Sequence, residues 1–249
     1  MDFSLRDKIA VITGAGRGLG QAMTLALAAA GADIVGVDVL PQDETAAAVR
    51  ALGRRFTPVF GDFSEPGRLD EAAAAVLSAF GRVDILVNNA GITPVVPAED
   101  TTEADFDRVM AVNVKSLYFF TQKIGRHMIE NGFGRIINVC SVQSLKGGMD
   151  VSAYIATKHA VAGITRALAN EWARFGLRVN GIAPGFMVTQ NTAGLRAKPD
   201  AVAALTAQIP MGRWGQPEDL QGPVVFLASE ASAYVNGHLL VVDGGHMNN

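Results

Sequence analysis

Cysteine is almost absent from this sequence, since Cys140 is the only one in 249 residues. A single cysteine cannot form an internal disulfide, and the four histidines, His127, His159, His238 and His246, do not stand at the close Cys/His spacings of a structural metal site. We therefore expect a chain that suits a reducing compartment and needs no metal, with the histidines in structural roles. Cys140 falls on a strongly apolar segment, which predicts an inert core thiol.

Long apolar runs and an excess of one charge are also missing. No uninterrupted apolar stretch reaches the length of a membrane span, and the N-terminal residues carry charge where a signal peptide needs an apolar run. Lysine and arginine total 21 against 24 acidic residues, so the net charge of -3 gives no footprint for nucleic acid or for an anionic membrane. We expect a cytoplasmic protein whose partner is a small molecule.

What the sequence has in abundance is a repeated pairing of a short β-rich apolar run with an Ala/Leu-rich helical segment. Such βα repeats predict a parallel sheet, and 49% hydrophobic residues suffice for a substantial core. The predicted strands are 8–13, 33–38, 57–60, 85–88, 135–140, 178–182 and 239–242. The predicted helices are 18–30, 42–52, 66–80, 103–130, 153–175 and 217–228. The expected fold class is α/β, a Rossmann-type doubly wound seven-stranded parallel sheet in three αβα layers, with residues 1–249 forming a single domain.

A glycine-rich turn follows the first predicted strand and leads directly into a helix. Its glycines, Gly14, Gly18 and Gly20, have the spacing G-x-x-x-G-x-G, and Arg17 and Leu19 lie among them. Glycine allows unusual backbone dihedrals and a close approach of main-chain N–H groups to a pyrophosphate, which the helix N-terminus also attracts. The turn therefore predicts a dinucleotide site, although a tight βα turn without a ligand would show the same glycines.

An acidic residue in the next strand bears on the choice of dinucleotide. Asp38 ends the second predicted strand, about twenty residues beyond the glycines. A carboxylate there accepts hydrogen bonds from the adenosine ribose hydroxyls, and its charge repels a 2′-phosphate. We expect NAD as the cofactor, with NADP less favoured because only Arg17 offers a cation for the 2′-phosphate.

Three further polar residues predict proton transfer. Tyr154 and Lys158 stand four apart at the start of a predicted helix, so they lie on one face. A free phenol has a pKa of about 10, and a neighbouring ammonium favours the phenolate that proton exchange with an alcohol requires. Ser141 closes the preceding strand at the carboxyl edge of the sheet, where ligands of open α/β folds bind. These residues predict a nicotinamide-dependent oxidoreductase that interconverts a secondary alcohol and a ketone.

One long segment breaks the βα alternation. Residues 187–213 mix Thr, Gln, Asn, Ala and Pro without a strong period, and they are too many for a simple connection. We interpret this segment as a mobile substrate lid.

Four further motifs join the glycine turn, Ser141 and the Tyr154/Lys158 pair. They are Asp62, Asn88-Asn89-Ala90-Gly91, Asn113, and Pro184-Gly185 followed by Thr189, and the glycine turn itself reads Thr13-Gly-x-x-x-Gly-x-Gly20. With these motifs the chain resembles the short-chain dehydrogenase/reductase family over its whole length. The resemblance implies Tyr154 as acid/base, Ser141 as carbonyl polariser, Lys158 as stabiliser of the phenolate and ligand of the nicotinamide ribose, and Asn113 as anchor of a proton-relay water. It also implies cofactor contacts near the adenine (Asp62, Phe63), the adenosine ribose (Asn89, Ala90, Gly91) and the carboxamide (Ile182, Pro184, Gly185, Met187, Thr189).

Parts of the C-terminal half are more specific. Residues 170–173, 183–192, 195–196, 212–215 and 234–237 are similar to the 2-deoxy-D-gluconate 3-dehydrogenases, also described as 2-dehydro-3-deoxy-D-gluconate 5-dehydrogenases. The likeness implies a deoxy or keto sugar acid, although two of these segments also occur in relatives that act on polyols and other ketones. A sugar acid needs a cation and several polar partners, for which the candidates are Gln143, Gln190, Arg196 and Trp214, with Lys146, Asn191 and Thr192 beside them. Ordinary loop or packing roles are the alternative for each, as for Met187.

Two alternative functions stay open at this point. A 3-oxoacyl carrier-protein reductase resembles the chain over the same span but prefers NADPH, which Asp38 argues against. A non-catalytic nucleotide-binding relative would have lost one of Asn113, Ser141, Tyr154 and Lys158, and all four are present. The resemblance also implies a homotetramer, because the long predicted helices from residues 103 and 153 are similar to those that build four-helix subunit interfaces in the family.

Overall fold

The computed structural model describes residues 2–65 and 67–248, and within them the chain forms one seven-stranded parallel sheet. The strands lie in the order β3-β2-β1-β4-β5-β6-β7. Their bounds are β1 Ile9–Thr13, β2 Asp33–Asp38, β3 Phe56–Phe60, β4 Ile85–Asn88, β5 Gly134–Val139, β6 Leu177–Pro184 and β7 Leu239–Val242. The predicted Rossmann-type fold is confirmed, with strand ends that differ from the prediction by at most two residues.

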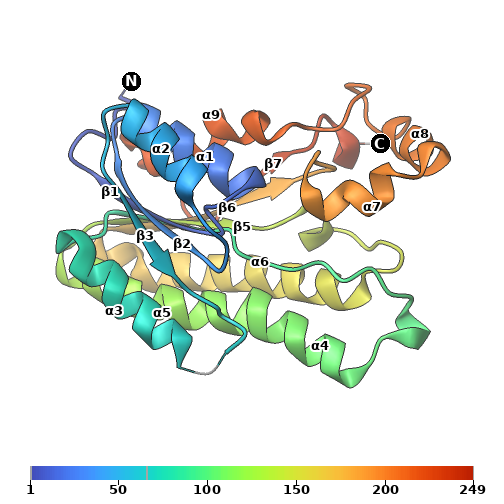
Figure 1. Cartoon of the computed structure of the whole chain (residues 1–249), viewed down its shortest axis with the longest axis horizontal. Helices are drawn as coiled ribbons and strands as arrows, with labels where there is room; N and C mark the ends of the chain where they lie inside the picture. Colours follow the sequence, from blue (N-terminus) through green and yellow to red (C-terminus); the bar gives the residue numbers. More distant parts are fainter. Residues whose placement is uncertain (1, 66, 249) are drawn as a thin grey trace.

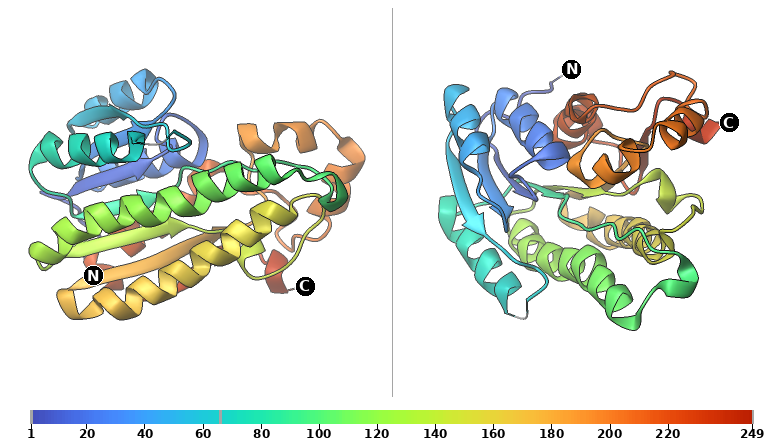
Figure 2. Two further views of the ribbon diagram at one scale, coloured as in Figure 1. Left: turned by 90° about the horizontal axis from the view of Figure 1, so that it is seen from below. Right: turned by 45° about the vertical axis from the view of Figure 1, so that its right-hand side comes forward.

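Helices cover both faces of the sheet and make the three predicted layers (Figure 1). One face carries α1 (Gly18–Ala29), α2 (Asp43–Ala51) and α9 (Gln221–Ala228), which share one apolar core. The other face carries α3 (Arg68–Phe80), α5 (Ser116–Glu130) and α6 (Ser152–Trp172), and Figure 2 shows α5 and α6 side by side across it. Among the described residues, no helix has the length and apolar character needed to cross a membrane.

The two cores follow from the period of two along each strand. Ile12 packs with Met23 and Leu27 of α1 on one side of the sheet, and its neighbour Val11 packs with Phe120 of α5 on the other. All five side chains are fully buried. Because both faces are covered, the strands consist of nearly continuous apolar runs, which is typical of a parallel sheet.

The strand order reverses beside β1, which lies between β2 and β4. In such sheets ligands bind at the carboxyl ends of the strands next to the reversal. The turns that follow β1, β4, β5 and β6 all reach this edge, and they carry the predicted glycine turn, residues 89–91, Ser141 and the segment from Gly185 to Thr189.

Three helical segments differ from the prediction. The expected helix 103–130 is divided into α4 (Glu103–Met110) and α5 by a π-helical segment, Ala111–Lys115, whose wider turn the apolar period does not reveal. The expected helix 153–175 begins at Ser152, and its end from residue 173 is a 3₁₀ turn, as is the start of the expected helix 217–228. The expected helix start at Pro66 lies outside the described residues, and α3 begins at Arg68.

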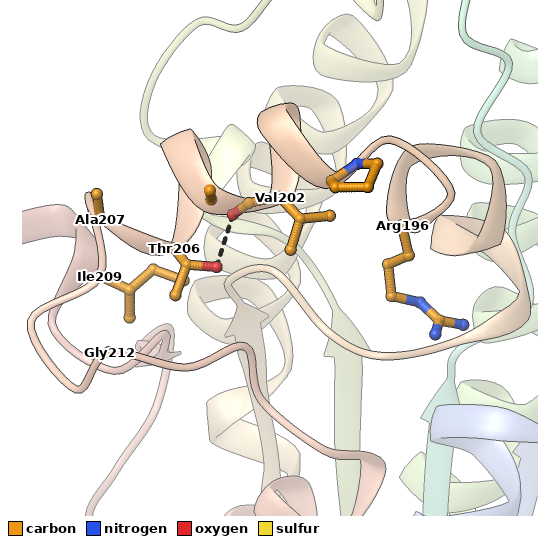
Figure 3. A pocket seen from close by; sticks show the side chains of 8 residues that line it. Arg196, Val202, Thr206, Ala207, Ile209 and Gly212 are labelled. Carbon is orange, nitrogen blue, oxygen red and sulfur yellow. Dashed lines mark hydrogen bonds between the residues drawn. The ribbon is translucent and has the colours of Figure 1, made fainter.

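The segment interpreted as a lid contains two short helices, α7 (Ala193–Arg196) and α8 (Pro199–Thr206). Beside them is an open hollow of about 680 Å³, to which α8 and the following loop contribute apolar side chains (Figure 3). None of Asn113, Ser141, Tyr154 and Lys158 is among the residues that line this hollow.

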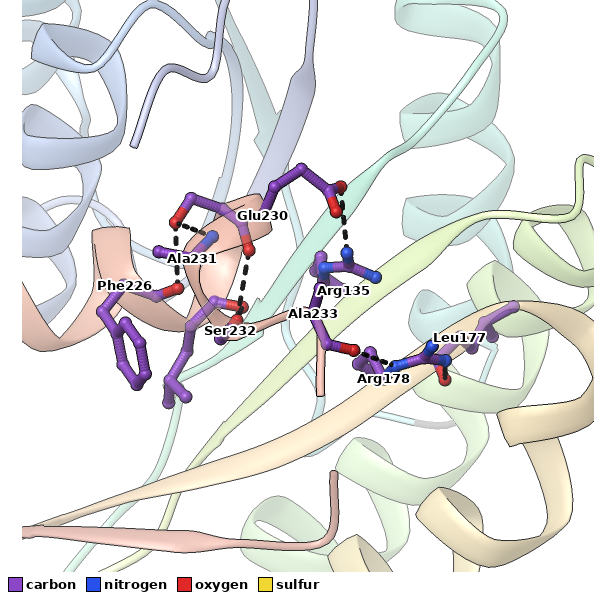
Figure 4. Close-up of polar contacts among 10 residues, drawn as sticks. Arg135, Leu177, Arg178, Phe226, Glu230, Ala231, Ser232 and Ala233 are labelled. Atoms are coloured by element: carbon purple, nitrogen blue, oxygen red, sulfur yellow. Dashed lines mark hydrogen bonds and ion pairs between the residues drawn. The ribbon is translucent and has the colours of Figure 1, made fainter. Parts of the chain in front are cut away.

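The opposite, amino edge of the sheet is held by two arginines (Figure 4). Arg135, near the start of β5, has a side chain only 4% exposed, and its Nη2 lies 3.0 Å from Oε1 of Glu230. Burial lowers the pKa of Arg135, and the attraction of Glu230 opposes that shift. Nε of Arg178 donates to the carbonyl of Ala233 over 2.8 Å. The two contacts fasten the turn after α9 to β5 and β6, far along the strands from the carboxyl edge.

Candidate functional site

Among the described residues, no side chain of the N-cap position or of the first turn caps the start of α1, which follows the glycine turn. Gly14 and Gly18 have φ values of +70° and +58°, a backbone conformation that residues with a side chain rarely adopt. Arg17 occupies the N-cap position, but its side chain makes no capping hydrogen bond, and the first turn of α1 holds no acidic residue. A Cβ on Gly20 would overlap the carbonyl oxygen of Gly14. The turn therefore leaves the first N–H groups of α1 free for an anion.

A clamp between β1 and β4 holds this turn. The hydroxyl of Thr13 accepts hydrogen bonds from the N–H groups of Asn89 and Ala90, both over 3.0 Å. The Asn89 amide in turn donates to the carbonyls of Thr13 and Gly14 over 3.0 and 3.2 Å. Asn89 and Ala90 thus lie beside the glycine turn. The role of Thr13 does not follow from the motif alone, although its place at the end of β1, just before Gly14, is the sequence signal for it.

Asp38 ends β2 beside the same turn. Its carboxylate accepts hydrogen bonds from the N–H of Gly16 over 2.8 Å and from the N–H of Leu40 over 3.0 Å, one on each oxygen. These contacts fix the orientation of the carboxylate next to the glycine turn, while Arg17 is exposed.

The two residues predicted near the adenine, Asp62 and Phe63, point to different surroundings after β3. Hydrogen bonds from the Ser64 hydroxyl over 2.6 Å and its N–H over 2.9 Å lower the pKa of Asp62, which keeps it ionised. The ring of Phe63 packs against Phe120, with 5.3 Å between the ring centroids. Asp62 is thus available at the edge, whereas the ring of Phe63 belongs to the core.

Tyr154, Lys158 and Ser141 are brought together where β5 ends and α6 begins. Lys158 is only 6% exposed, and its ammonium lies 5.5 Å from the ring centroid of Tyr154 and donates to the carbonyl of Val139 over 2.7 Å. The hydroxyl of Ser141 accepts the N–H of Gln143 over 3.1 Å, so its own proton is free to point elsewhere. The structure thus places the Lys158 ammonium next to the ring of Tyr154, and Ser141 stands at the end of β5, in the turn that continues to Ser144.

A second serine connects this cluster. Ser144 donates from its hydroxyl to the carbonyl of Lys158 over 2.8 Å and accepts the N–H of Ser141 over 3.2 Å. It was not predicted from the sequence, but it stands three residues after Ser141, the spacing of a capping box.

Asn113 lies in the π-helical segment and is buried. Its side-chain amide exchanges two hydrogen bonds of 2.8 Å with the backbone of Ile92 and donates to the Thr157 hydroxyl over 3.2 Å. Thr157 donates to the carbonyl of Tyr154 over 2.7 Å. Asn113 thereby links the loop after β4 to the first turn of α6, next to the cluster.

The segment after β6 continues the same edge. The N–H of Gly185 donates to the carbonyl of Val242 over 3.0 Å, and a Cβ on Gly185 would overlap Asp243. Ile182, Pro184 and Met187 are buried, and Met187 forms a parallel bridge with Gly215 at the root of the lid segment. The N–H of Thr189 donates to the hydroxyl of Thr192 over 3.1 Å.

The predicted substrate residues lie in three places: on the lid segment, in the core beside Phe186, and in the turn after Ser141. Gln190, Asn191 and Arg196 are exposed on the lid segment, and Nη2 of Arg196 donates to the carbonyl of Thr189 over 3.0 Å. Trp214 is buried, with its ring centroid 5.1 Å from that of Phe186. Gln143 and Lys146 belong to the turn that follows Ser141.

Two observations bear on metal and thiol chemistry. Within residues 2–65 and 67–248, no three His, Cys, Asp or Glu side chains form a group suited to a metal ion. Cys140 is buried, and that burial raises the pKa of its thiol, which agrees with the expected core role.

Known proteins are similar to this chain over nearly its whole length. A family profile described as enoyl-(acyl carrier protein) reductase matches residues 14–247. A 2-dehydro-3-deoxy-D-gluconate 5-dehydrogenase of Dickeya dadantii is 50% identical over 98% of this chain and 96% of its own. The enzyme of the same name from Escherichia coli is 49% identical over the same shares of the two chains.

A solved structure has the same arrangement of elements. The crystal structure of a gluconate 5-dehydrogenase from Burkholderia cenocepacia in complex with NADP and tartrate superposes with a TM-score of 0.94, at 38% identity over 100% of this chain and 98% of its own. The fold, the cluster of Tyr154, Lys158 and Ser141, and these likenesses lead to one conclusion. The chain belongs to the short-chain dehydrogenase/reductase family of oxidoreductases.

Proposed function

We propose that the protein is an NAD(H)-dependent oxidoreductase that interconverts a secondary alcohol and a ketone on a deoxy or keto sugar acid. The observation that carries the proposal is the placement of Tyr154, Lys158 and Ser141 around the carboxyl end of β5, at the same edge of the sheet as the glycine turn. The substrate class is supported by the relatives named 2-dehydro-3-deoxy-D-gluconate 5-dehydrogenase at about half identity.

The residues at the carboxyl edge fit a nicotinamide dinucleotide. Gly14, Gly18 and Gly20 leave room for a pyrophosphate at the uncapped start of α1, and Asp38 is oriented next to them. Leu19, Asp62 and the backbone around Phe63 would border the adenine half. Residues 89–91 and the segment from Pro184 to Thr189 would border the riboses and the nicotinamide. When bound, the cofactor supplies or accepts the hydride.

The chain's own side chains handle the proton. In the reducing direction the Tyr154 hydroxyl gives its proton to the substrate oxygen, and in the oxidising direction it takes that proton back. Lys158 has committed one donor to Val139, so two remain for the Tyr154 oxygen and a ribose hydroxyl. The Ser141 hydroxyl, oriented by the N–H of Gln143, donates to the same substrate oxygen as negative charge develops there.

Asn113 has a supporting part in this scheme. Its amide side chain is engaged by Ile92 and Thr157, so a relay water would bind the backbone of the π-helical segment. A π turn carries a hydrogen bond from residue i+5, here from the N–H of Ser116 to the carbonyl of Ala111, and such a turn disrupts the α-helical pairing of neighbouring carbonyls. Asn113 thus anchors the geometry around that water.

The cofactor preference rests on Asp38. Its fixed carboxylate favours the ribose hydroxyls of NAD and opposes the 2′-phosphate of NADP. Against this preference, the gluconate 5-dehydrogenase of Burkholderia cenocepacia was solved with NADP bound. Kinetics with both cofactors at one substrate concentration decide the matter, and a higher kcat/KM with NADPH would refute the preference.

A second candidate is reduction of the 3-oxo group of an acyl thioester, and the matching family profile also names an acyl carrier protein in its description. The two functions separate in one assay panel. Purified protein is tested with NADH and NADPH against keto sugar acids and against an acetoacetyl thioester. Activity on sugar acids supports the proposal, and activity confined to the thioester overturns it.

The mechanism is tested by Tyr154→Phe. Removal of the hydroxyl leaves the ring in place, so cofactor affinity, measured by fluorescence titration of NADH, should change less than about twofold. Turnover should fall at least about a hundredfold, because general acid–base catalysis supplies that much or more. Turnover within tenfold of the wild type would contradict the assignment of Tyr154.

Two further features belong to the proposal. The segment 187–213, with α7 and α8, acts as a lid over the substrate, attached at Met187 and Gly215. The protein assembles as a homotetramer through the face of α4, α5 and α6, on which α4 and α5 expose apolar side chains.

A further inference from the structure

A side-chain cluster outside the catalytic group lies beyond the ends of β5, β6 and β7. Nζ of Lys146 lies 2.8 Å from Nε2 of His246. The ring of Phe186 is stacked against two others, with centroid distances of 5.3 Å to His246 and 5.1 Å to Trp214. The four residues come from four separate segments, so the cluster depends on the tertiary fold.

The Lys146–His246 contact defines the charge of both groups. An ammonium has only donors, so Nε2 of His246 must accept, which leaves the ring neutral with its proton on Nδ1. Burial, and then the charge of Lys146, lower the pKa of His246, while Asp243 opposes the shift. Within the described part of the chain, no acidic side chain forms an ion pair with Lys146. His246 therefore positions a cation without neutralising it.

The cluster also offers neutral donors. Trp214 and His246 are 6% and 5% exposed, and their Nε1 and Nδ1 atoms are buried without a hydrogen-bond partner among the described residues. A buried donor is normally paired, and because each of these atoms exposes less than 1 Å², a ligand oxygen would reach the two N–H groups only after the side chains around them move. One cation and two N–H donors beside aromatic rings complement a carboxylate and the hydroxyls of a sugar acid.

The cluster is connected through the chain to the segments that carry the reacting groups. Lys146 follows Ser141 by five residues, in the turn that Ser144 fastens to the carbonyl of Lys158. Phe186 directly follows Gly185, which is fastened to Val242 at the end of β7. The lid segment reaches it too, since the N–H of Met211 donates to the carbonyl of Gly244, two residues before His246.

We propose that Lys146 binds the carboxylate of the substrate and that His246 positions Lys146 for this contact. The inference rests on the proposed function as a sugar-acid oxidoreductase and adds its specificity-determining cation. Arg196, the other candidate, is exposed on the lid and donates to its own segment at Thr189.

The first test compares an acid with a neutral substrate. Lys146→Met keeps the length of the side chain and removes the charge. For the sugar acid, KM should rise about tenfold to a hundredfold, the range of a lost charge-assisted hydrogen bond, with kcat within about threefold. For the same sugar with a hydroxymethyl group in place of the carboxylate, kcat/KM should be unchanged, and Lys146→Arg should restore most of the affinity for the acid.

The second test addresses the positioning residue. His246→Phe keeps a ring against Phe186 but removes the acceptor for Lys146, so KM should rise severalfold more for the acid than for the neutral substrate. His246→Gln, which retains an acceptor, should recover part of that loss. Circular dichroism spectra that match the wild type show that each variant is folded.

Arg196→Met tests the alternative, in which Arg196 and not Lys146 binds the carboxylate of the substrate. If Arg196→Met selectively weakens the acid and Lys146→Met does not, the assignment of Lys146 is overturned while the sugar-acid function stands. If the wild type reduces no keto sugar acid in the assay panel, the proposed function itself is lost. The two failures are therefore distinguishable.

Discussion

The proposed cofactor preference depends on one residue, Asp38, whose carboxylate is fixed beside the glycine turn. Asp38→Asn keeps an acceptor oxygen but removes the charge that repels a 2′-phosphate. We expect the ratio of kcat/KM for NADPH to that for NADH to rise about tenfold or more, since a charge at close range contributes at least 1.4 kcal/mol. Steady-state kinetics with both cofactors measure the ratio.

The control is Asp43→Asn, which removes the same charge from the exposed start of α2. Its ratio should stay within about twofold of the wild type. An equal rise in both variants would mean that the net charge of this edge sets the preference, and Asp38 would lose its assigned role.

At the residue scale, the sequence predicts residue types better than it predicts their partners. Ser141 and Tyr154 could be predicted because each lies at an element end that topology brings to the carboxyl edge. Thr13 and Asn89 are 76 residues apart, and Lys146 and His246 are 100 apart. Such contacts depend on sheet order and on the path of loops, about which local periodicity says nothing. His246 was accordingly assigned only a structural role.

At the element scale, α6 depends on hydrogen bonds that its own sequence does not reveal. Thr157 receives the Asn113 amide and donates to the carbonyl of Tyr154. Thr157→Val keeps the volume and removes both bonds. We expect the free energy of unfolding to fall by about 1–2 kcal/mol and kcat to fall about tenfold, because small misplacements of catalytic groups are costly. Urea denaturation and initial-rate assays provide the two numbers.

The same helix supplies a matched control in Thr165, which is equally buried, receives the Asn138 amide and donates to the carbonyl of Val161. Thr165→Val should lose similar stability and keep its kcat. Equal losses of kcat in the two variants would show that general loosening of α6, and not the link to Tyr154, limits turnover.

The π-helical segment shows why element boundaries were harder to predict than elements. Apolar residues continue through Ala111–Lys115, so the pattern predicts one helix from 103 to 130. A π turn adds one residue to a single turn and leaves the apolar face intact, so the composition carries no sign of it. The helices α7 and α8 were missed for a different reason, since four and eight residues are too few to establish a period.

At the scale of the whole molecule, the fold could be predicted because seven apolar runs alternate with helices, and parallel strands covered on both faces must be apolar throughout. The assembly could not be derived in this way. An apolar helix face has the same sequence pattern whether it packs on the sheet or on another chain. The expectation of a homotetramer therefore rests on the family resemblance alone.

The exposed face of α4 and α5 provides the test of assembly. Phe106, Tyr118 and Phe119 are each about 40% exposed, and a hollow of about 540 Å³ beside Tyr118 and Phe119 reaches Ile164 of α6.

Light scattering after size-exclusion chromatography should give the mass of four chains. Phe119→Glu places a charge in the proposed interface, so it should shift the mass to two chains or one. Phe60→Glu, at the 62% exposed end of β3, should leave four chains intact. A wild-type monomer, or a Phe119→Glu tetramer as stable to dilution as the wild type, would place the assembly elsewhere or remove it.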